Sequence, residues 1–280
     1  MIVPIVAAMI QASSAGAIQE VEIVTAATSV TVTGSSTVGR ATVSTTGGIA
    51  APQIVVENGV STILDSHQAT DILRGGYRVV VPSRARLTLK IRCKVATDKP
   101  CPNSTVRIDG VASVTLGVVD GDVSIQNVTG NVEASSLHGT LTIRNVGGTV
   151  EAASQTNAVN VSDVRGATIV RSTTGMIRLS SLAGGVTATN TTGEVWLSGR
   201  VSAESRYEMT TDIGQIRIDL APESNATIEV NARPEAITVR TPGARVTSRG
   251  ERRRVIVIGK GGARVSARTL SGGVDIGRRR

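Results

Sequence analysis

Residues 121–197 read, in successive blocks of 18, GDVSIQNVTGNVEASSLH, GTLTIRNVGGTVEAASQT, NAVNVSDVRGATIVRSTT, GMIRLSSLAGGVTATNTT and then GEVWL. Two apolar columns recur 18 residues apart near the start of each block, and they are two residues from each other. They are Val123, Leu141, Val159, Ile177 and Val195, followed by Ile125, Ile143, Val161, Leu179 and Leu197. Side chains two apart point to one face of a strand, so each block supplies a strand with two inward residues.

Half a period later, each block contains a second strand with smaller inner residues. Its columns are Val132, Val150, Thr168 and Val186, followed by Ala134, Ala152, Val170 and Ala188. A turn precedes every strand, marked by Gly121, Gly139, Asn157, Gly175 and Gly193 before the first strands and by Gly130, Gly148, Gly166 and Gly184 before the second. Asn157 fits the glycine column because Asn tolerates positive φ best after Gly.

Strands and glycines at a fixed short period predict an all-β fold, a parallel β-helix-like β-solenoid with about 18 residues per coil. A three-sided hexapeptide helix would repeat its signal every six residues, whereas the half-period here is nine residues. We therefore expect a flatter, two-faced coil, with Val and Ile or Leu lining one face and Val and Ala the other. A third inner column is expected near one edge, at Val128, Val146, Val164 and Leu182.

The sequence divides into three regions. Residues 1–17 are interpreted as a signal peptide, because the apolar run Ile2–Ile10 is followed by the small residues Ala15, Gly16 and Ala17, although no Lys or Arg precedes Arg40. The alternative is a buried first strand. Residues 18–82 are strand-rich but leave the 18-residue register, and we expect them to form an irregular N-terminal cap. Residues 83–280 are expected to form the solenoid domain with a basic C-terminal end.

After Leu197 the register slips by three residues, which predicts an insertion around Val201–Met209. Val265 with Ala267, and Val274 with Ile276, restore the nine-residue half-period, so we expect the last coil to close the same solenoid. No run after the signal reaches transmembrane length. These features predict an exported protein, located in the periplasm, on the cell surface or outside the cell.

Composition favours stacked coils over a compact enzyme core. The 280 residues include no Phe, one Trp and two Tyr, and stacked strands use small β-branched residues where compact cores use aromatics. The net charge of +8 is concentrated at one end, since residues 240–280 contain 12 basic and two acidic residues. Such a patch favours anionic surfaces such as lipopolysaccharide, teichoic acid or acidic lipid, or simply keeps an elongated protein soluble. We do not expect nucleic acid as a partner, because no aromatic platform accompanies the arginines.

The two cysteines, Cys93 and Cys101, flank a hydrophilic stretch that contains Asp98, Lys99 and Pro100. In an exported protein an even pair favours a disulfide. A metal pair would need two more ligands, and His67 and His138 lie in unrelated segments. Two free thiols are the remaining alternative.

Patterns of catalytic residues are scarce, so we expect no enzymatic activity, no cofactor and no metal. Two histidines do not readily build a triad, and neither a phosphate-binding glycine loop nor a zinc spacing is present. Glu133 and Glu151 stand 18 apart on an outward position. Stacked on adjacent coils they would be ~5 Å apart, near the separation of retaining glycosidase carboxylates. A surface ladder explains the same spacing without any catalysis.

Two groups of residues are candidates for a ligand surface. Trp196 lies between inward Val195 and Leu197, so we expect it to point outward, one coil beyond Arg178, where it could stack on a sugar or another partner. Alternatively, the insertion that follows covers it. The second group is Arg252, Arg253 and Arg254 in the basic end.

The phrases STTGMIRL, NTTGEVWL and TLSGGVDI, together with TTDIGQIRIDL before a Pro, resemble the bacterial "putative adhesin" domain family over residues 77–276. The family's Ser-Gly-Asp turn is replaced here at Gly175, Gly193 and Gly272. The resemblance implies a β-solenoid at the cell envelope with no established catalytic residues, and some relatives are associated with envelope-stress responses.

Three functions follow as hypotheses. The first is a non-enzymatic, exported solenoid that presents its surface to a cell-envelope or extracellular polymer or protein. The second is an envelope-stress component that binds an anionic ligand through the basic end. The third is a carbohydrate-active enzyme that uses Glu133 and Glu151.

Overall fold

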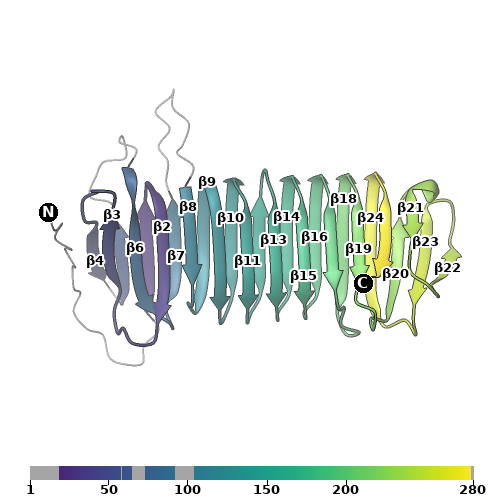
Figure 1. Ribbon diagram of the computed structural model, residues 1–280, viewed down its shortest axis with the longest axis horizontal. Helices are drawn as coiled ribbons and strands as arrows, with labels where there is room; N and C mark the ends of the chain where they lie inside the picture. The colour runs from purple at the N-terminus through teal and green to yellow at the C-terminus, as the bar shows by residue number, and fades with distance from the viewer. Residues whose placement is uncertain (1–18, 58, 65–72, 92–103, 279–280) are drawn as a thin grey trace, which may run out of the picture. The chain divides into compact units, whose positions relative to one another are not determined.

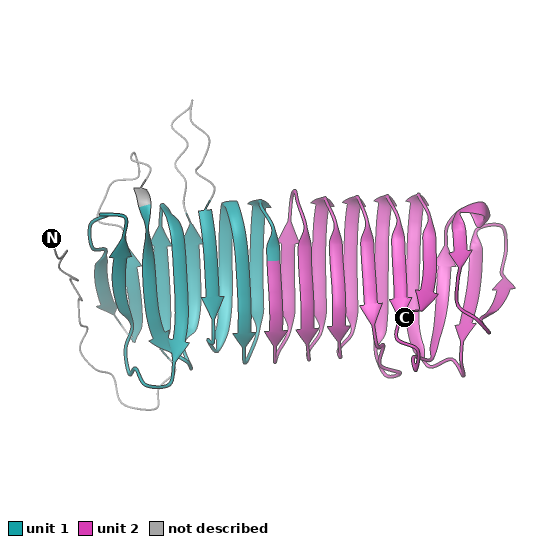
Figure 2. Cartoon of the chain, viewed as in Figure 1, with its two compact units in different colours: residues 1–141 teal, residues 142–280 magenta. Residues whose placement is uncertain are grey.

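Two compact units make up the chain, residues 1–141 and residues 142–280 (Figure 2). The computed structural model describes residues 19–57, 59–64, 73–91 and 104–278. The expected signal peptide, residues 1–17, and the cysteine pair, Cys93 and Cys101, lie outside these ranges. The described residues are almost entirely β-strands, joined by turns and a single short 3-10 helix, η1 (Pro234–Ala236). No helix long and apolar enough to cross a membrane occurs among them.

Unit 2 confirms the predicted β-solenoid, because its strands alternate between two parallel stacks (Figure 1). Stack A begins with β12 (Val150–Ser154), β14 (Thr168–Thr174), β16 (Val186–Thr192) and β18 (Arg206–Ile213). Stack B contains β11 (Leu141–Val146, of which unit 2 takes all but the first residue), β13 (Val159–Val164), β15 (Ile177–Leu182), β17 (Val195–Gly199) and β19 (Ile216–Leu220). Each strand pairs in parallel with the next strand of its own stack, and the chain crosses to the other stack after every strand. One crossing and one return make one coil.

The inner columns are buried as the sequence predicts. In stack B, Val159 pairs with Ile177 and Ile177 with Val195, and all three side chains are at most 1% exposed. Stack A carries the smaller set, with Val170 beside Ala188. Side chains from the two stacks therefore fill a core between them, while backbone hydrogen bonds run along each stack. The third column is buried as well, at Val128, Val146, Val164 and Leu182.

The two sets of turn glycines differ in backbone conformation, although in both a Cβ would approach the backbone of the neighbouring coil closely, at 2.1 Å for Gly175. In the first set, Gly175 has φ +134° and Asn157 has φ +80°, so these turns require a backbone that side chains disfavour. Gly166 in the second set has no positive φ. A Cβ there would lie 2.5 Å from the carbonyl oxygen of Gly148 in the coil below, so this position excludes side chains by close approach.

This close approach gives a stability prediction. Gly166→Ala should lower the free energy of unfolding by about 1–3 kcal/mol, because the added methyl group overpacks against backbone that cannot rotate away. Urea unfolding followed by circular dichroism measures the change. Gly39→Ala is the control, since a Cβ at Gly39 meets nothing within 4 Å. Equal stability of the two variants would contradict this account of the second glycine set.

A third recurrent conformation was not predicted. Asn145, Asp163 and Ser181 have φ of 52°, 57° and 55°, and each immediately precedes a residue of the third inner column. A left-handed residue at this corner turns the following side chain into the core. Asn and Asp adopt this conformation more readily than other non-glycine residues.

The insertion after β17 is shorter than predicted. Tyr207 lies 21 residues after its register partner Val186 instead of 18, and the three extra residues lie within the loop 200–205. Tyr207 and Met209, which the prediction placed in the bulge, are instead inner residues of β18, at most 1% exposed. The Tyr207 hydroxyl accepts a hydrogen bond from the Ser202 amide at 2.9 Å and donates one to the Leu182 carbonyl at 3.4 Å.

The last coil has the predicted register but an unexpected place. It consists of β24 (Ala263–Ser271) and β25 (Val274–Arg278), which keep the predicted nine-residue half-period and pair with β18 and β19. On their other edges, β24 pairs with β20 (Ala226–Asn231) and β25 with β21 (Ile237–Val239). The C-terminal coil therefore fills a slot inside the stack. The end of stack A is covered by an antiparallel hairpin, β22 (Arg245–Ser248) and β23 (Arg253–Ile258), which adds to β20.

Unit 1 uses the same arrangement at the start of the chain. β1 (Glu20–Thr25) lies between β5 (Val60–Leu64) and β7 (Arg86–Ile91), and β2 (Ala27–Ser35) lies between β6 (Leu73–Pro82) and β8 (Ser104–Asp109). β3 (Thr42–Thr46) and β4 (Gln53–Glu57) add antiparallel edges to β6 and β5. β9 (Ser113–Val128) spans both stacks, and β10 (Val132–His138) pairs with its first half. The first coil is therefore regular in register, although its partners are distant in sequence.

Candidate functional site

The outward side chains of stack B form two rows across unit 2. The pairing register places Asn160 beside Arg178, Arg178 beside Trp196 and Trp196 beside Arg217 in the first row. The second row contains Ser162, Ser180, Ser198 and Asp219. Parallel pairing at ~4.8 Å repeats each row at the strand spacing. This face therefore combines hydroxyls, arginines and the one tryptophan of the chain.

A groove of about 600 Å³ is hollowed into this face over β11, β13, β15 and β17. Two cations line it, Arg144 and Arg178. Its neutral polar lining comprises Asn160, Ser162, Ser180, Ser181 and Ser198. Asp163 is the one acidic residue of the lining, and Trp196 forms its aromatic part. The groove is therefore polar and carries a positive balance of charge.

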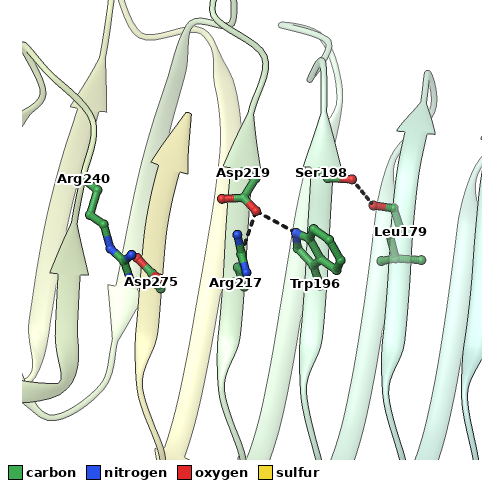
Figure 3. Close-up of polar contacts among 7 residues, drawn as sticks. All are labelled: Leu179, Trp196, Ser198, Arg217, Asp219, Arg240 and Asp275. Atoms are coloured by element: carbon green, nitrogen blue, oxygen red, sulfur yellow. Dashed lines mark hydrogen bonds and ion pairs between the residues drawn. The ribbon is translucent and has the colours of Figure 1, made fainter. Parts of the chain in front are cut away.

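Trp196 is held in place by its neighbours on β19 (Figure 3). Its indole N–H donates to Asp219 Oδ2 at 3.0 Å, and Arg217 Nε donates to the same oxygen at 2.7 Å. The guanidinium carbon of Arg217 lies 5.0 Å from the Trp196 ring centroid, and that of Arg178 lies 6.0 Å from it. Contacts at this range are favourable cation–π interactions. Two arginines from neighbouring strands therefore flank a half-buried ring whose polar edge is anchored.

The structure brings together Arg178 and Trp196, the first pair of predicted ligand residues. Trp196 points outward in register with Arg178, as parity predicts. The contacts to its ring and its N–H come from Arg178, Arg217 and Asp219 on the two neighbouring strands.

Arg252, Arg253 and Arg254, the second predicted group, lie elsewhere, beside stack A, and each has a different partner. Arg252 donates to the Leu270 carbonyl at 3.2 Å. Arg253 forms an ion pair of 2.7 Å with Glu229, and Arg254 donates to the Gly250 carbonyl at 2.9 Å within the β22–β23 turn. The three guanidiniums therefore contact three different segments, β24, β20 and the β22–β23 turn.

The carboxylates considered for glycoside hydrolysis belong to different units. Glu133 is an exposed residue of β10 in unit 1, opposite Thr115. Glu151 lies in unit 2, where it forms an ion pair of 2.6 Å with Arg171. Among the residues that the structure describes, no group of three or more His, Cys, Asp or Glu side chains could hold a metal ion.

Sequence reasoning missed most of the groove. Arg144, Ser162, Ser180 and Ser198 stand 18 residues apart, in the same alignment that yields the inner columns. Reading the outward columns as carefully as the inward ones would have found them. Arg217 and Asp219 follow the inserted loop and are displaced by three residues, so the fixed period does not reach them.

The family model described as Toastrack DUF4097 matches residues 18–277 of the chain. This chain is a member of the Toastrack DUF4097 family. The match confirms the predicted resemblance to a "putative adhesin" type of domain family. It spans both units of this Toastrack chain, including every residue of the groove.

Two solved structures are similar to this Toastrack chain. One, described as a "putative adhesin" from Bacteroides fragilis, is 12% identical with a TM-score of 0.47, covering 99% of this chain and 97% of that chain. The other, described as a "putative cell adhesion protein" from Clostridium sporogenes, is 10% identical with a TM-score of 0.25, covering 94% of each chain. No curated protein matches the chain.

Proposed function

We propose that this chain is a non-enzymatic, exported binding module that presents the outer face of stack B to a polymer or protein of the cell envelope or extracellular space. The observation that carries the proposal is the groove over β11, β13, β15 and β17, with its two arginines and its anchored tryptophan. In a solenoid the inward residues hold the coils together, so recognition falls to the outward rows. Export is supported by the apolar run Ile2–Ile10 and the small residues that follow it.

The test measures binding to cell-envelope material. Fluorescently labelled protein should sediment saturably with washed bacterial envelopes. Ser180→Trp, which fills the groove, should weaken this binding about tenfold or more, since the ligand loses its contact surface. Thr189→Trp is the matched control, because Thr189 is an exposed outward residue of stack A. Export predicts that the protein recovered from cells begins near Ile18.

Two results would reject this function. If Ser180→Trp leaves envelope binding unchanged, the groove is not the site that recognises the ligand. Release of reducing ends from envelope glycans by the wild-type protein, lost on mutation of a groove residue, would show an enzyme instead of a binding module.

A second candidate function is supported by β24. Arg264 and Arg268 are exposed outward residues of this strand, and neither joins an ion pair within the described ranges. They give stack A a basic surface beside Arg253, which pairs with the same residue, Asn231, as Arg268 does. An envelope-stress component that binds an anionic envelope ligand would use this surface, and Arg264→Gln with Arg268→Gln would then abolish binding.

A further inference from the structure

Two arginines of the groove carry charge that the protein itself does not neutralise. Among the described residues of unit 2, six arginines form ion pairs with carboxylates: Arg171 with Glu151, Arg200 with Glu223, Arg206 with Glu208, Arg217 with Asp219, Arg240 with Asp275 and Arg253 with Glu229. Arg144 and Arg178 join no ion pair among the described residues, yet they line the same groove. A guanidinium presents five donors and prefers carboxylate, sulfate or phosphate oxygens. The groove is therefore suited to an anionic ligand.

The lining between the two arginines is rich in hydroxyl groups, and Asp163 of β13 is its one carboxylate. Arg144 belongs to β11 and Arg178 to β15, with Asn160 and Ser162 of β13 between them. At two strand spacings, roughly 9–10 Å separate the backbones of β11 and β15. A ligand that reaches both cations must cross this floor, where each hydroxyl can donate and accept. Polyhydroxylated ligands satisfy such a floor, whereas a lone phosphate leaves most of it unused.

Trp196 completes the recognition chemistry. Its ring is an apolar surface in an otherwise polar groove, and Asp219 holds its N–H so that the ring does not swing away. The carbon-bound hydrogens of a sugar ring pack against such a surface. Ser162, Ser180 and Ser198 repeat along the stack, which suits a ligand that is itself repetitive.

We propose that the groove binds an acidic polysaccharide along the stack, with its anionic groups on Arg144 and Arg178, its hydroxyls on the serine row and a sugar face against Trp196. This inference rests on the proposed function and names the ligand class. The anionic groups can be carboxylates of uronic acids or sulfate or phosphate esters, which share the same guanidinium chemistry.

The test uses the full chain and three defined polymers: polygalacturonate, dextran sulfate and neutral dextran. Trp196 is the one tryptophan of the chain, so ligand in the groove should change the intrinsic fluorescence directly. Polygalacturonate or dextran sulfate should bind and neutral dextran should not. The tighter of the two acidic polymers identifies the anionic group. Affinities are measured by calorimetry, because Arg178 itself affects the tryptophan signal.

Matched variants locate the binding site. Arg144→Gln with Arg178→Gln should weaken binding of the acidic polymer about tenfold or more, because two charge-assisted contacts are lost. Arg264→Gln with Arg268→Gln removes the same charge from the rival surface on stack A, so it distinguishes the two sites: if the groove is the site, the affinity changes less than about twofold, beyond a small shared salt-dependent loss. Both variants alter exposed side chains, so folding is expected to be preserved.

The proposal is overturned if neutral dextran binds as tightly as the acidic polymers, if polyglutamate binds more tightly than both of them, or if only the stack A variant loses affinity. If no polysaccharide binds while labelled protein still sediments with envelopes in a Ser180-dependent manner, the ligand class is wrong and the proposed function stands. If envelope binding fails as well, both are rejected.

Discussion

Deleting nine residues from unit 2 is expected to be more damaging than deleting 18. Removal of Thr168–Gly185 takes out one complete coil, so that Val186 follows Ala167 and pairs with Val150 in place of Thr168. Both stacks keep their order. In a solenoid, where stability is roughly a sum over coils and their interfaces, the shortened protein should fold with a single transition and somewhat lower stability.

Removal of Thr168–Met176 takes out half a coil and shifts every following strand to the opposite stack. Ile177 and Leu179 of β15 would then lie over Val150 and Ala152, while the smaller residues of β16 would lie over β13. The larger residues of β15 would overpack stack A, which should cost about 1–3 kcal/mol of stability. The smaller residues of β16 would leave a cavity in stack B, which should cost about 2–5 kcal/mol. The close-approach glycine turns also lose their partners.

Urea unfolding followed by circular dichroism compares the two deletions, and both retain Trp196 as a second probe. We expect the half-coil deletion to be less stable than the full-coil deletion by several kcal/mol, or not to fold, although it removes fewer residues. Equal stability of the two proteins would mean that the two stacks are interchangeable, against the assignment of larger residues to stack B.

Tyr207→Ala is expected to be among the most destabilising single substitutions in unit 2. Tyr207 is fully buried between Val186 and Val265, in a column where other coils of unit 2 use Val, Thr or Ile. Truncation should cost about 3–5 kcal/mol through the cavity, with a further loss because the Ser202 amide loses its acceptor.

Two companion variants separate these contributions. Tyr207→Phe keeps the ring and removes the hydroxyl, so it should cost about 1–3 kcal/mol, mainly at the 200–205 loop. Glu208→Ala changes the adjacent outward residue and its exposed pair with Arg206, with an expected cost of at most about 1 kcal/mol. Thermal and urea unfolding measure the stabilities of the three variants and so give their order. If Tyr207→Phe is neutral, the hydroxyl does not anchor the loop.

The repeat predicted the core because a column is a local property of sequence. Val159, Ile177 and Val195 are 18 residues apart in the sequence and lie side by side on neighbouring strands of stack B. The repeat did not predict the neighbours of β1 and β24. β1 pairs with β7 and β24 with β20, at sequence separations unrelated to the 18-residue period. The pattern could place their residues inward but could not say against which strand.

The groove escaped prediction for a different reason. Burial constrains inward columns to apolar residues, so they stand out against the background, whereas outward columns accept almost any polar residue. Arg178 and Trp196 were visible because Trp is rare on a surface. Arg144 is a candidate ligand residue because it lines the groove and has no carboxylate partner in the described ranges. Neither feature can be read from the spacing of residues in the sequence.

The position of β24 and β25 also determines the order in which unit 2 can be completed. Until the ribosome has released residue 278, β18 and β20 have no strand between them, and both present unpaired backbone edges. β24 and β25 therefore close a gap bounded on both sides by strands that are synthesised earlier. The stack can grow coil by coil during translation up to β19, but β20 and β21 can join it only after β24 and β25 have emerged from the ribosome.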